Sequence, residues 1–168
     1  MTLNALILFH VVLSLIGIVA GFAVVRGLLF SGPPYRATTL FVISTAATSV
    51  TGFFFPFHGF TPGQAIGILS LIVLLIAGLA AYRHRLGGGW RRAFAITAVI
   101  ALYFNVFIFV IQLFRKAPAL HAIAPTQSEP PFQAAQWLVL VIFVAIGIRA
   151  AMKTKIVAGR TQKKETYV

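Results

Sequence analysis

The chain has little charge, two acidic residues and no cysteine. Only 10% of its 168 residues are charged and 60% are hydrophobic, whereas a soluble domain carries roughly 25% charged residues. The absence of cysteine excludes a disulfide framework, a thiolate nucleophile and a Cys-ligated metal site. Of the two acids, Glu129 and Glu165, the second lies in the C-terminal tail. Paired-carboxylate catalysis is therefore excluded, and with no strained Gly-x-Ser-x-Gly turn the sequence leans away from an enzyme.

Long apolar runs make up most of the chain. A helix needs about 20 apolar residues to cross the roughly 30 Å of membrane hydrocarbon, and such runs recur at about 2–25, 38–55, 64–82, 93–114 and 132–152. The first lacks the basic start and short core of a cleaved signal peptide, so we expect it to be retained. Membrane spans must satisfy their own backbone hydrogen bonds, and no alternating barrel pattern is present. We predict an all-α bundle of five transmembrane helices in residues 1–152 and a basic, disordered tail in residues 153–168.

Most basic residues fall on one side of the membrane if these spans cross it alternately. Two lie in the first loop, four flank the third loop and six close or follow the last span, together twelve of the fourteen Lys and Arg residues. Arg115 and Lys116 lie on the other side. The positive-inside rule then predicts an outer N-terminus and a cytoplasmic C-terminus. Because the charges lie in short segments beside apolar spans, we expect them to meet anionic lipid headgroups rather than nucleic acid.

Helix-start signals support two of these spans. Thr61, Pro62 and Gln64 have the spacing of a capping box with proline at the first helical position, so we expect a helix to begin there. Before the last span, Glu129 precedes two prolines and lies where the helix dipole favours an anion. Between the third and fourth spans, three consecutive glycines predict a tight turn, and Trp90 after them is expected at the headgroup level.

Small and polar residues share one face of each of the first four spans. Packing of helices in lipid relies on small residues that allow close approach, and Gly17 and Gly21 form such a pair in the first span. The second span is rich in hydroxyls, and the fourth places Asn105 seven residues before Gln112. Such hydroxyls usually bond back to their own helix and serve packing alone. The competing interpretation is a transporter or channel for a small neutral solute, lined by Thr48, Thr51, Asn105 and Gln112.

Three histidines and one carboxylate fall on the predicted outer side. His10 lies about two turns into the first span, His58 lies in a phenylalanine-rich loop, and His121 and Glu129 lie between the last two spans. Imidazoles with a carboxylate could bind a divalent transition metal, a pair of imidazoles could hold haem, and one could donate to a quinone. No pair has metal-ligand spacing. His58 and His121 are also explained as interfacial loop residues and Glu129 as a helix-start anion, whereas an imidazole in the apolar layer, as at His10, needs a partner. The sequence identifies no cofactor.

Three segments resemble a set of small, uncharacterised bacterial inner-membrane proteins. They are residues 101–107 with 112–114, residues 124–132 and residues 52–57, so that the resemblance covers roughly the second to the fifth span. It implies a multi-pass protein of the bacterial inner membrane and implies no activity. The sequence therefore favours a small non-enzymatic membrane component, either free-standing, homo-oligomeric or accessory to a partner protein. A solute transporter and a metal-, haem- or quinone-binding protein are the alternatives.

Overall fold

A computed structural model describes residues 3–56, 59 and 61–165, with side chains through residue 153. This part of the chain is helical and contains no strand, which confirms the predicted all-α class. The helices are α1 (Leu3–Phe30), α2 (Tyr35–Gly52), α3 (Pro62–Gly78), a π-helical turn η1 (Leu79–Arg83), α4 (Trp90–Lys116), α5 (Pro118–Ile123) and α6 (Pro130–Glu165). The last helix continues in its backbone beyond Met152 into the segment predicted to be a tail.

Four helical segments are long and apolar enough to cross a membrane, so the chain has the character of a multi-pass membrane protein. They are Leu3–Phe30, Pro62–Arg83, Trp90–Lys116 and Pro130–Lys153. The second predicted span corresponds to α2, which has 18 residues and many hydroxyl side chains. It is absent from the four apolar segments, although it packs against both α1 and α3. Five spans therefore stay a prediction.

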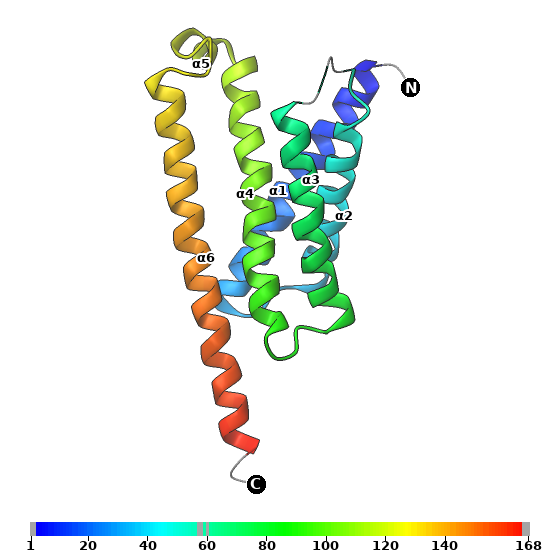
Figure 1. Cartoon of the computed structure of the whole chain (residues 1–168), viewed down its shortest axis with the longest axis vertical. Coiled ribbons are helices and arrows are strands. Elements are labelled where there is room, and N and C mark those ends of the chain that lie inside the picture. The colour runs from blue at the N-terminus through cyan, green and yellow to red at the C-terminus, as the bar shows by residue number, and fades with distance from the viewer. Residues whose placement is uncertain (1–2, 57–58, 60, 166–168) are drawn as a thin grey trace.

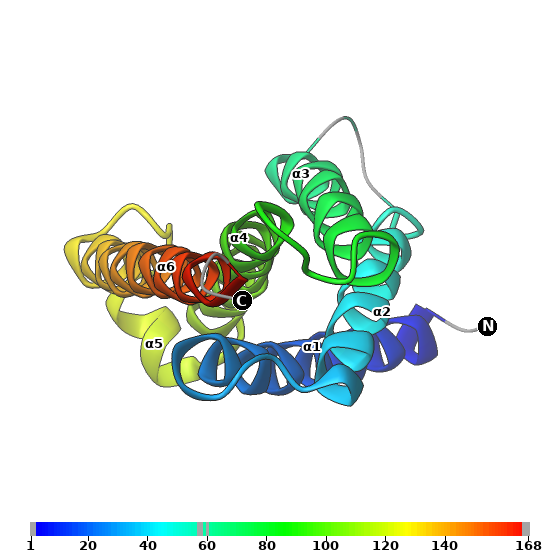
Figure 2. The same ribbon diagram turned by 90° about the horizontal axis from the view of Figure 1, so that it is seen from below.

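The long helices lie side by side, with their connections gathered at two ends (Figure 1). The N-terminus, the α2–α3 connection and α5 lie at one end, which we call the N-terminal end. The α1–α2 and α3–α4 connections lie at the other, which we call the basic end because it carries the arginines of the first and third loops. Seen along the bundle, α1, α2, α3 and α4 surround a common centre, and α6 lies on the outer side of α4 (Figure 2).

The helix boundaries follow from the residues at them. The Thr61 hydroxyl accepts from the Gln64 N–H at 3.3 Å, and Gln64 Oε1 accepts from the Thr61 N–H at 2.8 Å, which confirms the predicted capping box. At the end of α1, the Gly27 carbonyl accepts from the N–H groups of Ser31 and Gly32. A Cβ at Gly27 would lie 2.5 Å from the Gly32 carbonyl oxygen, so this close return of the chain requires glycine.

The last helix is held against α4 and α1 by side chains that donate to backbone carbonyls. Gln136 Nε2 donates to the Phe107 carbonyl of α4 at 3.3 Å. At the basic end, Lys153 Nζ donates to the Leu29 and Phe30 carbonyls at the end of α1 and lies 5.7 Å from the Phe30 ring centroid. A cation at a helix C-terminus is favoured by its dipole.

The apolar core occupies the half of the bundle nearest the basic end. It comes from the second halves of α1 and α3 and the first halves of α2 and α4, with Phe143 and Ala150 of α6. Val24, Phe41 and Leu102 are fully buried in it. The other half of the same four helices holds the cavity described next.

Candidate functional site

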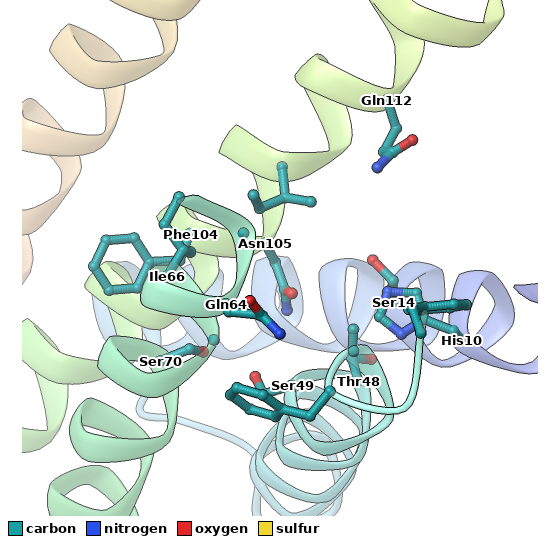
Figure 3. A pocket seen from close by; sticks show the side chains of 16 residues that line it. His10, Ser14, Thr48, Ser49, Gln64, Ile66, Ser70, Phe104, Asn105 and Gln112 are labelled. Carbon is teal, nitrogen blue, oxygen red and sulfur yellow. The ribbon is translucent and has the colours of Figure 1, made fainter. Parts of the chain in front are cut away.

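A cavity of about 170 Å³ lies between α1, α2, α3 and α4 in the half nearest the N-terminal end (Figure 3). Phe53 and Phe55, which follow α2, form part of its wall. Phe57, His58 and Phe60 of the same phenylalanine-rich loop lie outside the described residues. The polar residues of the wall are His10, Ser14, Thr48, Ser49, Gln64, Ser70, Asn105 and Gln112.

The structure brings the residues of the predicted solute pathway together. Thr48, Asn105 and Gln112 line this one cavity. Thr51 does not line it but hydrogen-bonds to His10, which does. Thr48 and Asn105 are buried, and Gln112 is exposed. Residues from four helices line this single space.

The imidazole of His10 has a defined partner inside the bundle. Its Nδ1 lies 3.0 Å from the Thr51 hydroxyl, and that hydroxyl donates its proton to the Ala47 carbonyl at 2.8 Å. Since the Thr51 proton is already used, His10 must donate from Nδ1, and this assignment leaves Nε2 as an acceptor. The Phe55 ring packs edge-on against the imidazole at 5.1 Å between centroids and holds its orientation.

Most hydroxyls of α2 donate their protons to carbonyls of their own helix. Ser44, Thr48 and Ser49 each donate to the carbonyl four residues earlier, at 2.6, 2.8 and 3.0 Å. This is the back-bonding expected of hydroxyls in an apolar helix. The packing interpretation therefore accounts for the donors of α2, while the lone pairs of these hydroxyls stay available as acceptors.

Other polar atoms on the cavity wall have no partner among the described residues. Ser14 and Ser70 make no hydrogen bond to their own helices, and both amide atoms of Gln112 are free. Gln64 uses only Oε1 in the capping box, which leaves its Nε2 without an acceptor. These groups lie around one space in which a bound molecule or water would satisfy them.

Asn105 links the site to the packing of the bundle. Its Nδ2 donates to the Thr45 hydroxyl at 3.0 Å, across from α4 to α2, while Oδ1 accepts from no described group. Both partners lie against Gly17 of α1, where a Cβ would approach Thr45 Oγ1 to 2.9 Å and Asn105 Nδ2 to 3.3 Å. The small residue in α1 therefore lets the three helices meet around this hydrogen bond.

The cavity is closed toward the basic end. About one helical turn beyond Gly17 lies Gly21, where a Cβ would lie 2.6 Å from Leu102 Cδ1 and 2.9 Å from Phe41 Cε2. Phe41 and Leu102 are themselves fully buried. Because this layer leaves no room even for a methyl group, the space is a one-ended site and not a continuous pore.

The described residues do not form the four-residue metal site that the sequence suggested. His121 lies on α5, on the opposite flank of the bundle from the start of α1, which carries His10 (Figures 1 and 2). Glu129 directly precedes α6 on that same flank, and His58 lies outside the described residues. Within the described part of the chain, no group of three or more His, Asp or Glu side chains is placed to hold a metal.

Glu129 instead organises the turn that leads into α6. Its carboxylate accepts from the Thr126 N–H at 3.0 Å, the Thr126 hydroxyl at 2.8 Å and the Ser128 N–H at 3.1 Å. Desolvation acts to raise the pKa of Glu129, but these hydrogen bonds outweigh it and lower the pKa from its usual 4.5. The carboxylate thus serves the preceding loop.

Sequence reasoning missed the part that three residues play in this site. Ser14 and Ser70 belong to the small residues on the helix faces and Gln64 to the capping box, and all three line the cavity. For Gln64 a signal existed, because a capping glutamine uses one end of its amide and leaves the other free.

Comparisons with models of protein families, with curated proteins and with solved structures found no match for this chain.

Proposed function

We propose that the protein is a multi-pass component of the bacterial inner membrane that binds a small uncharged molecule on its outer side. The outward orientation rests on the gathering of the loop arginines at the basic end, opposite the cavity. The inner-membrane location rests on the sequence resemblance. A reporter fused to the C-terminus is expected to be active in the cytoplasm and one fused to the N-terminus outside; both termini reporting from one side would contradict the orientation.

The observation that carries the binding proposal is the set of unpaired hydrogen-bonding atoms around one cavity. In a bundle surrounded by lipid, polar groups without partners are costly, so their gathering in one space indicates a ligand site. The hydroxyls of Thr48, Ser49 and Thr51 on α2 donate to their own helix and need no ligand for their protons. The amide of Gln112 and the Gln64 Nε2 have not been satisfied in that way.

The lining also defines the class of ligand. None of the residues around the cavity is Asp, Glu, Lys or Arg, so a charged molecule would find no counter-ion there. Donors from Gln64 and Gln112 and acceptors from Asn105 and His10 suit a molecule with both donor and acceptor groups. A cavity of about 150 Å³ is known to hold benzene, which sets the size of a ligand for the 170 Å³ found here.

Direct binding tests this proposal. Urea, glycerol and hydroquinone are suitable probes, with toluene as an apolar comparison of similar size, and the side-chain amide NMR signals of Asn105 and Gln112 report on the site. We expect saturable shifts with at least one polar probe and weaker binding after Gln112→Leu. Gln133→Leu is the matched control, because this exposed glutamine of α6 donates to the Ser128 carbonyl and lies outside the cavity. Binding that survives both Gln112→Leu and Asn105→Leu unchanged would contradict the proposed site.

Transport is the second function to test. The cavity ends at the closed layer of Phe41 and Leu102. Movement of a solute across the membrane would require that layer to separate. Flux of the bound probe in proteoliposomes, abolished by Asn105→Leu and Gln112→Leu, would establish a transporter. Binding without flux would establish a binding protein, and reproducible copurification of another protein in mild detergent would support the accessory role predicted from the sequence.

A further inference from the structure

A second cavity, apolar and larger, runs along the outer side of the bundle between α4 and α6. Its volume is about 560 Å³. Tyr103 and Arg92 are the only polar residues in its wall; the others are Ile96, Val99, Ile100, Phe104, Leu140, Phe143, Val144, Gly147, Ile148, Ala151 and Met152. We call this space the α4–α6 groove. It shares only Phe104 with the wall of the polar cavity, so it is a separate site.

The α4–α6 groove has the length of one membrane leaflet. Along α4 it extends from Arg92 to Phe104, which at 1.5 Å per residue is about 18 Å. Half of a hydrocarbon layer of roughly 30 Å is about 15 Å. Arg92 lies in the first turn of α4, and Met152 lies near it on α6, so the groove starts at the basic end. An acyl chain that entered the groove there would reach the middle of the bilayer.

Arg92 supplies an unneutralised charge at the mouth of the α4–α6 groove. Its side chain is exposed, and no hydrogen bond or ion pair joins it to any described group. Glu129, the one acidic residue whose side chain the structure describes, lies at the opposite end of the bundle. The neighbouring Arg91 turns the other way, toward the α1–α2 connection, where its Nη2 would lie 4.0 Å from a Cβ on Gly32. Arg92 is therefore the arginine of this pair that faces the groove.

We propose that the α4–α6 groove binds an anionic phospholipid, with one acyl chain along the apolar wall and the headgroup phosphate on Arg92. A guanidinium matches a phosphate in both charge and geometry. Lys153 of α6 donates to the end of α1 at the same end of the bundle, Arg149 precedes it by about one helical turn, and both add to the positive field. A second copy of this chain is a poorer occupant, because packing two such faces together would oppose like charges in a protein of net charge +12.

Native mass spectrometry of the full chain, released from mild detergent, tests the proposal. Phosphatidylglycerol and phosphatidylcholine with identical acyl chains are added at equal concentration. We expect phosphatidylglycerol to bind preferentially, and Arg92→Gln to weaken that binding about five-fold, the effect of one basic residue at a membrane surface. Arg36→Gln is the matched control, since it removes an exposed charge at the same end but on α2, and it should change binding less than two-fold.

Filling the α4–α6 groove provides an independent test. Val144 lines the groove and is 51% exposed, so Val144→Phe occupies space there without opening a cavity in the core. We expect it to weaken the binding of both lipids, whereas soluble glycerol phosphate should fail to displace phosphatidylglycerol. Equal losses from Arg92→Gln and Arg36→Gln, no preference for the anionic lipid, displacement by glycerol phosphate, or a lipid-free dimer that Val144→Phe dissociates would each overturn the proposal.

Discussion

The two halves of the bundle formed by α1, α2 and α4 are packed with side chains of different size and polarity. In the half nearest the basic end, Gly21 admits Phe41 and Leu102, whose large side chains fill the space between the helices completely. In the other half, Gly17 admits Thr45 and Asn105, which are smaller and polar. One glycine repeat therefore produces a solid core at one end and a cavity at the other, because the side chains it meets differ in volume.

This comparison shows where stability and function are separated along the bundle. The apolar half has no room for a ligand and fixes the relative positions of the helices. The polar half can keep hydrogen-bonding atoms unpaired because the core beside it provides the stability. Changes in the first half should therefore alter the free energy of unfolding, and changes in the second should chiefly alter binding.

The largest effect is expected from emptying the apolar half. Phe41→Ala removes a fully buried ring and should lower the free energy of unfolding by about 3–5 kcal/mol. Phe54→Ala is the control, because Phe54 is 69% exposed and should change stability by less than about 0.5 kcal/mol. Reversible unfolding in mixed micelles measures both. Equal losses for the two variants would show that the basic half is not a packed core.

Overfilling the same layer should have the next largest effect. Gly21→Ala places a methyl group 2.6 Å from Leu102 Cδ1, which should cost about 1–3 kcal/mol of stability. At Gly78 of α3 a Cβ meets no described atom within 4 Å, so Gly78→Ala should be neutral or mildly stabilising, as expected for alanine in a helix. Thermal unfolding of both variants in one detergent makes the comparison. A stable Gly21→Ala protein would mean that α1 and α4 are farther apart than the structure has them.

A smaller effect is expected from the hydrogen bond that borders the cavity. A double-mutant cycle of Asn105→Leu and Thr45→Val should give a coupling energy of about 0.6 kcal/mol, the average for such bonds between membrane helices. Thr97→Val combined with Asn105→Leu is the control, because the Thr97 hydroxyl donates to its own helix at Ala93. Coupling of similar size in both cycles would remove the specific role of the Asn105–Thr45 bond.

The smallest effect concerns the loop beside the polar half, where the polar groups are already paired. Since the pKa of Glu129 is lowered in the folded protein, its contribution to the turn is complete above the usual value and is lost as pH falls through the lowered one. We expect protection of the Thr126 and Ser128 amides from hydrogen exchange to decline as pH falls below the usual value of 4.5. Glu129→Gln should remove this pH dependence, and a decline of equal size in that variant would contradict the role of the carboxylate.

Helix starts and inward faces were predictable because each depends on residues near in sequence. The capping box at Thr61 needs only a spacing of three residues, and the inward face of α1 needs only the repeat of Gly17 and Gly21. The structure does not bring His10 together with His121 and Glu129, and the reason is the opposite one. These residues come from separate segments, and their meeting depends on where α5 and α6 pack beside α4, far from the start of α1. Loop position around a bundle is set by tertiary packing, and no local pattern encodes it.

The lining of the cavity was predictable only in part. Thr48, Asn105 and Gln112 were found because polar residues in an apolar helix stand out. Gln64 was overlooked because its cap explained it fully at the level of sequence. Whether the space between these groups is filled or empty depends on the sizes of side chains from four helices, which only the assembled bundle shows.

The hydroxyl-rich sequence of α2 has a consequence for how the chain enters the membrane during synthesis. This helix is less apolar than its neighbours and by itself would be a weak signal for the insertion machinery. It follows α1 through the tight return at Gly27 and Gly32, so it meets lipid already paired with the apolar helix before it. We therefore expect α1 and α2 to insert as one hairpin, and a chain that begins at Tyr35 to leave its first helix outside the bilayer.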